Sequence, residues 1–290
     1  MPSPSLTPFV FDADHLTALA RAHRGEYAAA SPFPHIVLDA FLPPEVVTQL
    51  IDEFPAPEAN IWLSGRRGER HKLQLDDEVV LPPFTRQVLW AFNSAVFLRF
   101  LTELTGIEGL IADPSLWGGG LHQTCSGGWL AVHADFYRHP LLNLDRRLNV
   151  LVFLNPTWHP EWGGALELWA RDMSTCVQHI MPVLNRCVIF NTTDWSFHGH
   201  PEPLACPHDV SRRSLALYYY SNGRPVGDVM ARWNTTLFRA RPGTHDADNV
   251  VALRIKHYLL QCVPPIVIDL KRRLFGRQVD RTSGARPTPQ

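Results

Sequence analysis

The spacing of apolar residues divides the first hundred residues into helices and one strand. Residues 12–30 show a short helical pattern, with Asp12 or Asp14 as its N-cap. Residues 42–55 begin with prolines and then form one apolar stripe at helical spacing. The apolar, β-branched segment 33–41 between them predicts a strand. The longest helical pattern covers 84–107 and is expected to stop at Gly106.

From about residue 115 to residue 222 the pattern changes to short β-type runs separated by turn signals. No helical pattern of a dozen residues lies between these runs, which favours an antiparallel sandwich or jelly roll over alternating strands and helices. The predicted fold is therefore α+β with a mainly β core, and helices at both ends. The predicted strands lie within 118–135, 146–155, 164–170, 177–191 and 212–221.

The remaining segments predict the domain organisation. Residues 60–83 are polar and irregular and are interpreted as a mobile surface loop. Residues 250–277 read as two helices separated by a Pro-Pro break, followed by a disordered tail. The predicted divisions are an N-terminal helical extension (1–31), a core domain with supporting helices (32–225), and a C-terminal helical extension (226–290).

Composition limits the class of protein. The 290 residues are 45% hydrophobic and 19% charged with a net charge of −1, which is typical of a globular protein and gives no reason to expect a nucleic-acid partner. The five cysteines are widely spaced without a CxxC, so neither a disulfide framework nor a zinc knuckle is expected. No signal peptide and no apolar run of roughly 20 residues is found, so we expect a cytoplasmic protein without a transmembrane segment.

Candidate metal ligands lie at the end of one predicted strand. In the sequence WLAVHAD, alternation places His133 and Asp135 on the same side. This pair alone is weak evidence, but His198 follows a second strand about sixty residues later. Two histidines and one carboxylate can hold one face of an octahedral ion and leave the other face open. His200 is a rival to His198, because the sequence HGH puts both on one side of an extended chain.

An arginine on the last predicted strand could bind an acidic ligand beyond the metal. Arg212 and Ser214 share one face of that strand, and together supply a guanidinium fork and a hydroxyl. Arg213 points to the opposite face. We favour Arg212, and the choice between the two arginines is left to experiment.

The ordered set His133-x-Asp135, His198 and Arg212-x-Ser214 resembles the iron(II)/2-oxoglutarate-dependent oxygenases, and most closely their prolyl 4-hydroxylase-like branch. The likeness covers roughly residues 32–222. Supporting segments are PFPHIVLDAFLPPEVVTQLIDEFP, RRLNVLVFLNPTWHPEWGGALELW and HGHPEP. The last fits a His-x-x-Pro pattern with Pro201 in place, which favours His198 over His200 as the ligand.

The resemblance implies a double-stranded β-helix (jelly roll) in which His133, Asp135 and His198 hold iron(II) and serve catalysis. It also implies that Arg212, with Ser214 beside it, binds the far carboxylate of 2-oxoglutarate. Further pocket residues implied by position are Asn149, Phe153 and Gln123. Gln123 stands where some relatives have a tyrosine. The cofactor set implied is iron(II), 2-oxoglutarate and dioxygen, with ascorbate as a candidate reductant.

The activity implied is hydroxylation of an unactivated C–H bond, with 2-oxoglutarate converted to succinate and CO₂. Asp135 favours hydroxylation over halogenation, because relatives that halogenate lack this carboxylate. Two alternatives stay open: a jelly-roll metal dioxygenase that does not use 2-oxoglutarate, and a non-catalytic sensor or scaffold. The substrate, a small molecule or a peptidyl residue, and the oligomeric state cannot be read from the sequence. His139, Arg138 and His159 are interpreted as loop residues on the surface.

Overall fold

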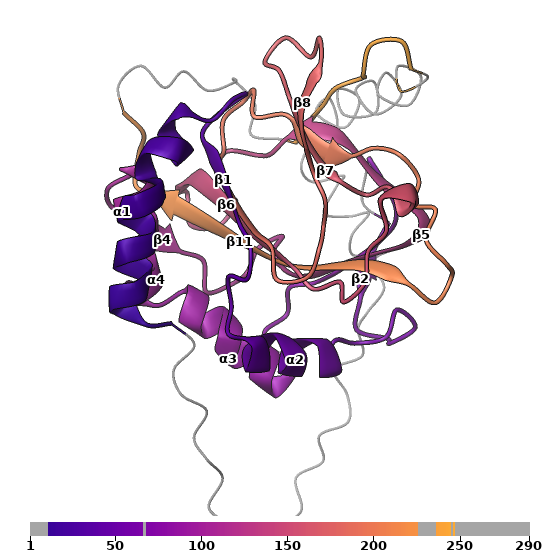
Figure 1. The fold of residues 1–290 in the computed structure, drawn as a ribbon, viewed down its shortest axis with the longest axis horizontal. Coiled ribbons are helices and arrows are strands. Elements are labelled where there is room, and N and C mark those ends of the chain that lie inside the picture. Colours follow the sequence, from indigo (N-terminus) through magenta and orange to yellow (C-terminus); the bar gives the residue numbers. More distant parts are fainter. Residues whose placement is uncertain (1–10, 66–67, 226–235, 245, 247–290) are drawn as a thin grey trace, which may run out of the picture. The chain divides into compact units, whose positions relative to one another are not determined.

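The computed structural model describes residues 11–65, 68–225, 236–244 and 246 of the chain. Within these ranges the core is one mainly antiparallel sheet that curls into a nearly closed barrel (Figure 1). The strands follow the order β1-β9-β6-β11-β5-β10-β7-β8, so segments distant in sequence become neighbours. These strands are β1 (His35–Leu38), β5 (Gly120–Ala134), β6 (Asp145–Phe153), β7 (Leu166–Trp169), β8 (Cys176–Ile180), β9 (Cys187–Asn191), β10 (His198–His200) and β11 (Ser211–Ser221).

Four short strands extend this sheet. β3 (Glu69–Leu75) and β12 (Leu237–Phe238) pair with β5, β2 (Leu63–Ser64) pairs with β3, and β4 (Ile111–Ala112) pairs with β11. The mainly β core predicted from the sequence is confirmed. The segment 60–83, however, is not an irregular loop, because β2 and β3 form a hairpin on β5. Its strand was missed because Lys72 and Gln74 are polar yet buried, so the polar face of β3 lies inside the protein.

Four helices and one 3-10 turn accompany the sheet in the described residues: α1 (Ala13–Ala29), α2 (Pro44–Asp52), α3 (Pro83–Phe92), α4 (Ala95–Thr105) and η1 (Pro160–Trp162). Asp12 caps α1 as predicted, accepting a hydrogen bond from the His15 backbone. The single helix predicted over 84–107 is two helices. Ser94 caps α4 by accepting from the Phe97 N–H, since short polar side chains compete for backbone hydrogen bonds. Gly106 ends α4 in the left-handed conformation, as predicted.

The helices bury one face of the sheet, and the other face carries polar residues together with a smaller apolar cluster that includes Phe153 and Phe190. Leu148 and Val150 of β6 and Leu217 of β11 belong to one apolar core with side chains from all four helices. Successive residues of a strand alternate between faces, so the intervening residues of β6 and β11 face the interior of the barrel. Figure 1 shows α1 beside α4, and α2 beside α3, at the edge of the barrel. The interior face is where the candidate ligands gather.

The structure leaves two other expectations from the sequence untested. The predicted helices of 250–277 lie outside the described residues, and the two boundaries between the three predicted divisions stay predictions. Within the described ranges, no helix has both the length and the apolar character needed to cross a bilayer.

Candidate metal centre

Three potential ligands converge at one end of the barrel. His133 lies near the end of β5, Asp135 follows that strand, and His198 begins β10 directly opposite His133 in the antiparallel register. The Nε2 atom of His133 lies 3.6 Å from Oδ1 of Asp135, and Nε2 of His198 lies 3.5 Å from Oδ2. One donor atom from each of the three residues falls within 4.8 Å of the others. The structure thus brings together all three residues predicted as ligands.

Both imidazoles are held so that Nε2 faces the centre. Nδ1 of His133 is 2.8 Å from the Ala131 carbonyl, and Nδ1 of His198 is 2.9 Å from the Ser196 carbonyl. A carbonyl only accepts hydrogen bonds, so each Nδ1 carries the hydrogen and each Nε2 presents a lone pair. Burial, reinforced by His133, lowers the pKa of His198 to about 4. His198 is therefore neutral at pH 7, which is the form that binds a metal.

Asp135 is kept ionised by a buried arginine. Burial alone would raise its pKa, but Arg146 and then His198 outweigh burial and hold the pKa of Asp135 well below its usual range. Nη2 of Arg146 donates to Oδ2 of Asp135 at 3.0 Å, and Nδ2 of Asn149 donates to the same oxygen at 2.7 Å. Asn149, predicted as a pocket residue, thus lies at the metal centre and orients the carboxylate.

Sequence reasoning missed Arg146, which is only 1% exposed and stacks 3.4 Å from the Tyr218 ring. Simple alternation along β6 assigns Arg146 to the helix-facing side with Leu148. The register with β11 shifts there: Tyr219 opposes Leu148, whereas Tyr220 opposes Arg146, so β6 carries an extra residue. Such a bulge turns the side chains beyond it to the other face. Nothing in the sequence around Arg146, three residues before Asn149, indicates this change of face.

Arg212 lies inside the barrel, and Arg213 does not. Arg212 is 7% exposed, its Nε donates to the Gly164 carbonyl at 2.7 Å, and its guanidinium carbon lies 4.8 Å from the centre of the Phe153 ring. Burial lowers its pKa to about 9, and none of the described residues forms an ion pair with it. Ser214 is buried on the same face, opposite Phe153 of β6. Arg212 is thus a buried cation that has no anionic partner within the described part of the chain.

Arg213 and Gln123 occupy the other face. The guanidinium of Arg213 lies over the Phe54 ring of the helical layer. Gln123 is the register partner of Arg213, and its Nε2 donates to Oγ of Ser211 at 2.7 Å. Register partners point to the same side of a sheet, so the structure places Gln123 on the face opposite Arg212 and does not bring it together with the other predicted pocket residues. The residue of β5 opposite Arg212 is Thr124.

Two histidines outside the triad are buried, and for one of them, His139, this differs from expectation. His139, interpreted as a surface residue, is 2% exposed, lies 3.4 Å from Oδ2 of Asp113 and accepts backbone N–H groups from Leu141 and Leu142. It orders the turn after β5, which sequence alone did not show. His200 is also buried, and burial, with Arg212, holds its pKa well below the usual range. His159 is half exposed and Arg138 is exposed, as predicted.

A short strand from the C-terminal extension lies beside the centre. Phe238 of β12 is the register partner of His133, and the centres of their two rings are 5.7 Å apart. The next residue, Arg239, donates its backbone N–H to the Val132 carbonyl at 2.9 Å. Phe238 also contacts the β2–β3 turn at Gly68. An apolar ring therefore covers one side of His133.

This contact predicts a difference between two glycines of the same turn. Gly65 and Gly68 both have positive φ, but a Cβ on Gly68 would lie 2.1 Å from the Phe238 ring, whereas a Cβ on Gly65 would meet nothing within 4 Å. We expect Gly65→Ala to cost about 1–2 kcal/mol in unfolding free energy from backbone strain, and Gly68→Ala to cost about 1–3 kcal/mol more from overpacking. Urea denaturation measures both. Equal costs would contradict the packing of Phe238 on this turn.

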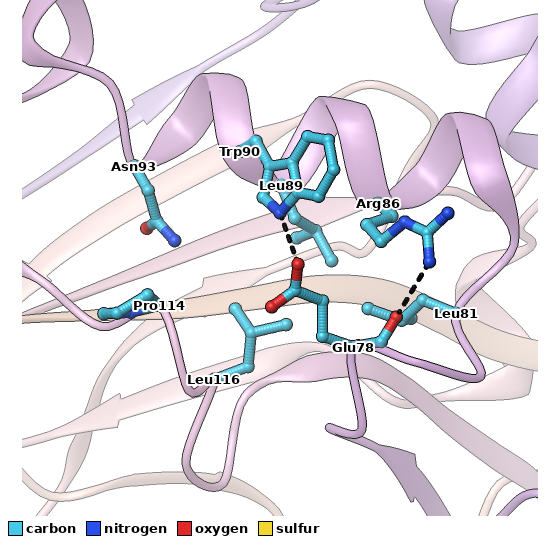
Figure 2. Close-up of a pocket in the computed structure, with 8 residues that line it drawn as sticks. All are labelled: Glu78, Leu81, Arg86, Leu89, Trp90, Asn93, Pro114 and Leu116. Atoms are coloured by element: carbon cyan, nitrogen blue, oxygen red, sulfur yellow. Dashed lines mark hydrogen bonds between the residues drawn. The ribbon is translucent and has the colours of Figure 1, made fainter.

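A separate surface hollow has different chemistry. It lies beside α3 and holds one carboxylate, Glu78, whose side chain accepts the Trp90 indole N–H at 2.7 Å (Figure 2). The hollow contains neither a histidine nor a cysteine, so it offers no second set of metal ligands. Its lining residues are Glu78, Leu81, Arg86, Leu89, Trp90, Asn93, Pro114 and Leu116.

Comparison with known proteins agrees with the metal-binding geometry of the three candidate ligands. Residues 119–220 match the sequence profile of the 2OG-Fe(II) oxygenase superfamily. No curated protein gives a significant match over the chain.

Solved structures are similar in fold at low sequence identity. One is a prolyl hydroxylase from Trichoplax adhaerens in complex with a peptide fragment of hypoxia inducible factor (TM-score 0.53, 16% identity, covering 72% of this chain and 91% of the other). Another is a prolyl 4-hydroxylase from Phytophthora capsici (TM-score 0.51, 18% identity, 76% and 69% covered). A third is HygX from Streptomyces hygroscopicus with nickel and 2-oxoglutarate bound (TM-score 0.50, 12% identity, 76% and 96% covered). These likenesses confirm the predicted double-stranded β-helix.

Proposed function

We propose that this chain, whose segment 119–220 belongs to the 2OG-Fe(II) oxygenase superfamily, hydroxylates an unactivated C–H bond of its substrate. The superfamily uses iron(II), 2-oxoglutarate and dioxygen, and the chain is a 2-oxoglutarate/Fe(II) dioxygenase. In the proposed reaction, substrate, 2-oxoglutarate and dioxygen give hydroxylated substrate, succinate and CO₂. The observation that carries the proposal is a buried guanidinium, without an anionic partner among the residues that the structure describes, on the same barrel interior as a His-Asp-His cluster.

The residues of the centre fit iron(II). Two imidazole nitrogens and one carboxylate oxygen form the donor set used by non-haem iron(II) oxygenases, which keep the remaining coordination positions open. His133, Asp135 and His198 would hold the ion, and backbone carbonyls fix both imidazoles in the metal-binding tautomer. Arg146 and Asn149 keep the carboxylate ionised and oriented.

Arg212 and its surroundings fit a dicarboxylate. Its Nε is already bonded to the Gly164 carbonyl, which leaves the terminal nitrogens for a carboxylate. Phe153 packs against the guanidinium and excludes water, and the hydroxyl of Ser214 lies on the same face. In this arrangement Arg212 would bind the far carboxylate of 2-oxoglutarate while the metal supplies the redox chemistry at the other end. Phe238 would exclude water beside His133.

Replacing Arg212 or Arg213 by alanine is expected to have different effects on 2-oxoglutarate binding. We expect Arg212→Ala to weaken 2-oxoglutarate binding about ten- to a hundredfold, because a charge-assisted hydrogen bond to a carboxylate is lost. Arg213→Ala should change it by less than about twofold, since that side chain lies over Phe54 outside the barrel. Titration of the metal-loaded protein with 2-oxoglutarate measures both. Equal loss in the two variants would show that the cosubstrate does not bind at Arg212.

The function itself is tested by product analysis. Protein loaded with iron(II) and supplied with 2-oxoglutarate in air should release succinate, and a correct substrate should increase that release. The alternatives give other results: a scaffold releases none, and a dioxygenase independent of 2-oxoglutarate oxidises substrate without succinate. A screen of small molecules and peptides by succinate release would identify the substrate, and omitting ascorbate would test its predicted role as reductant.

A further inference from the structure

His200 is a buried polar side chain without a hydrogen-bond partner in the described ranges of the chain. It is 3% exposed, and neither of its ring nitrogens bonds to any described residue. A neutral imidazole always presents one donor and one acceptor, and buried polar groups in native proteins are normally bonded. A side chain in this condition indicates that a bound molecule supplies the missing partner.

The backbone fixes where His200 lies. It is two residues beyond His198 on β10, and alternation places both imidazoles on one face of that strand. Gly199 between them packs against β5 so closely that a Cβ there would be 2.9 Å from the Leu130 carbonyl oxygen. A side chain larger than glycine at this position would therefore push β10 away from β5. The pairing register of β10 on β5 shifts between His198 and His200, with one more residue on β5 than on β10, so the alternation along β10 itself is kept.

The charges around His200 favour an anion. Burial holds the pKa of His200 well below its usual range, and the positive charges of Arg212 and then Lys72 lower it further. Lys72 is already paired with Glu69 at 3.3 Å. Within the described part of the chain, Arg212 bonds the Gly164 carbonyl and forms no ion pair. Of the two cations that act on His200, Arg212 is therefore the one whose charge is not compensated by a described carboxylate.

We propose that His200 is a further cosubstrate-binding residue, whose imidazole hydrogen-bonds the same far carboxylate that pairs with Arg212. The inference rests on the proposed function, because it needs 2-oxoglutarate as the ligand. The far carboxylate would then accept a hydrogen bond from His200 on β10 in addition to those from the Arg212 guanidinium on β11. His200 would therefore contribute to selection of a dicarboxylate over ligands that have only the metal-chelating end.

Binding to the nickel(II)-loaded protein, measured by calorimetry without turnover, tests this role. The probes are 2-oxoglutarate and oxalate, which can chelate the metal but has no far carboxylate at the Arg212 position. We expect His200→Leu to weaken 2-oxoglutarate binding about tenfold or more and to leave oxalate within about twofold of the wild type. His200→Asn keeps a donor and should recover part of the loss. His159→Phe, at a half-exposed histidine, is the matched control and should change neither.

Each other result would overturn the inference. Unchanged 2-oxoglutarate affinity in both His200 variants would show that the side chain does not touch the cosubstrate. Equal loss for 2-oxoglutarate and oxalate would show that the substitutions disturb the metal ligands instead. Nickel affinity and melting temperature, measured on the same samples, detect misfolding, and His200→Asn then decides the outcome. If the wild type itself binds oxalate but not 2-oxoglutarate, the proposed function fails, which is a distinct result.

Discussion

Asp135→Ala is expected to abolish metal binding and to destabilise the metal-free protein by about 3–5 kcal/mol. The substitution removes one of three ligands, and it also leaves the Arg146 guanidinium buried without its carboxylate. An uncompensated buried charge is the larger part of the stability cost. The double variant Asp135→Ala/Arg146→Met should regain most of the stability and none of the metal binding, because the buried charge is gone but the ligand is still missing.

Urea denaturation of the metal-free protein and calorimetric metal titration measure the two effects separately. Asp39→Ala is a matched control, because Asp39 also pairs with an arginine, Arg186 at 2.6 Å, but its side chain is 63% exposed. An exposed pair of this kind is worth about 1 kcal/mol or less. If the double variant were no more stable than Asp135→Ala, the buried pair would not be the cause. If Asp135→Ala kept wild-type metal affinity, the ligand assignment would be wrong.

Acidification is expected to destabilise the metal-free protein between pH 6.5 and 4. Burial lowers the pKa of His198 from 6.5 to about 4 in the folded state, so the unfolded chain binds more protons than the folded one in this window. Stability therefore falls as pH falls, by about 3 kcal/mol from this residue. His200, whose pKa is also lowered, adds to the loss in the same direction. Asp135, with its lowered pKa, loses its contribution only at lower pH, below about 3.9.

A series of urea denaturation curves from pH 7 to pH 4.5 tests this prediction. His198→Asn should reduce the slope of unfolding free energy against pH, whereas His159→Gln, at a half-exposed position, should leave that slope unchanged. A wild-type slope that stays flat through this window would show that His198 binds its proton over the same pH range in the folded and unfolded chain. Burial would then not hold the imidazole in its neutral form as the structure indicates.

The metal triad and Arg212 could be predicted because both depend on local alternation. His133 and Asp135 are two residues apart near a strand end, and Arg212 and Ser214 are two residues apart on another strand. A period of two fixes which side chains share a face without any knowledge of the partner strands. The order of the motifs along the chain then identified His198 as the third candidate metal ligand.

Features that depend on pairing between strands could not be predicted in this way. Arg146 reaches Asp135 because a bulge reverses its face, and Gln123 misses the pocket because it lies opposite Arg213. Neither pairing register can be read from the sequence of one strand alone. The hairpin of β2 and β3 was missed for a related reason: a polar barrel interior makes a strand such as β3 as polar as a loop.

The central claim is that one barrel interior holds both a metal and 2-oxoglutarate. Anaerobic titration of the iron(II)-loaded protein with 2-oxoglutarate tests this claim most directly, because simultaneous binding to iron(II) produces a visible metal-to-ligand charge-transfer band. The account predicts the band in the wild type and its loss in His133→Ala. A wild-type protein without the band, or a band that survives His133→Ala, would contradict the account.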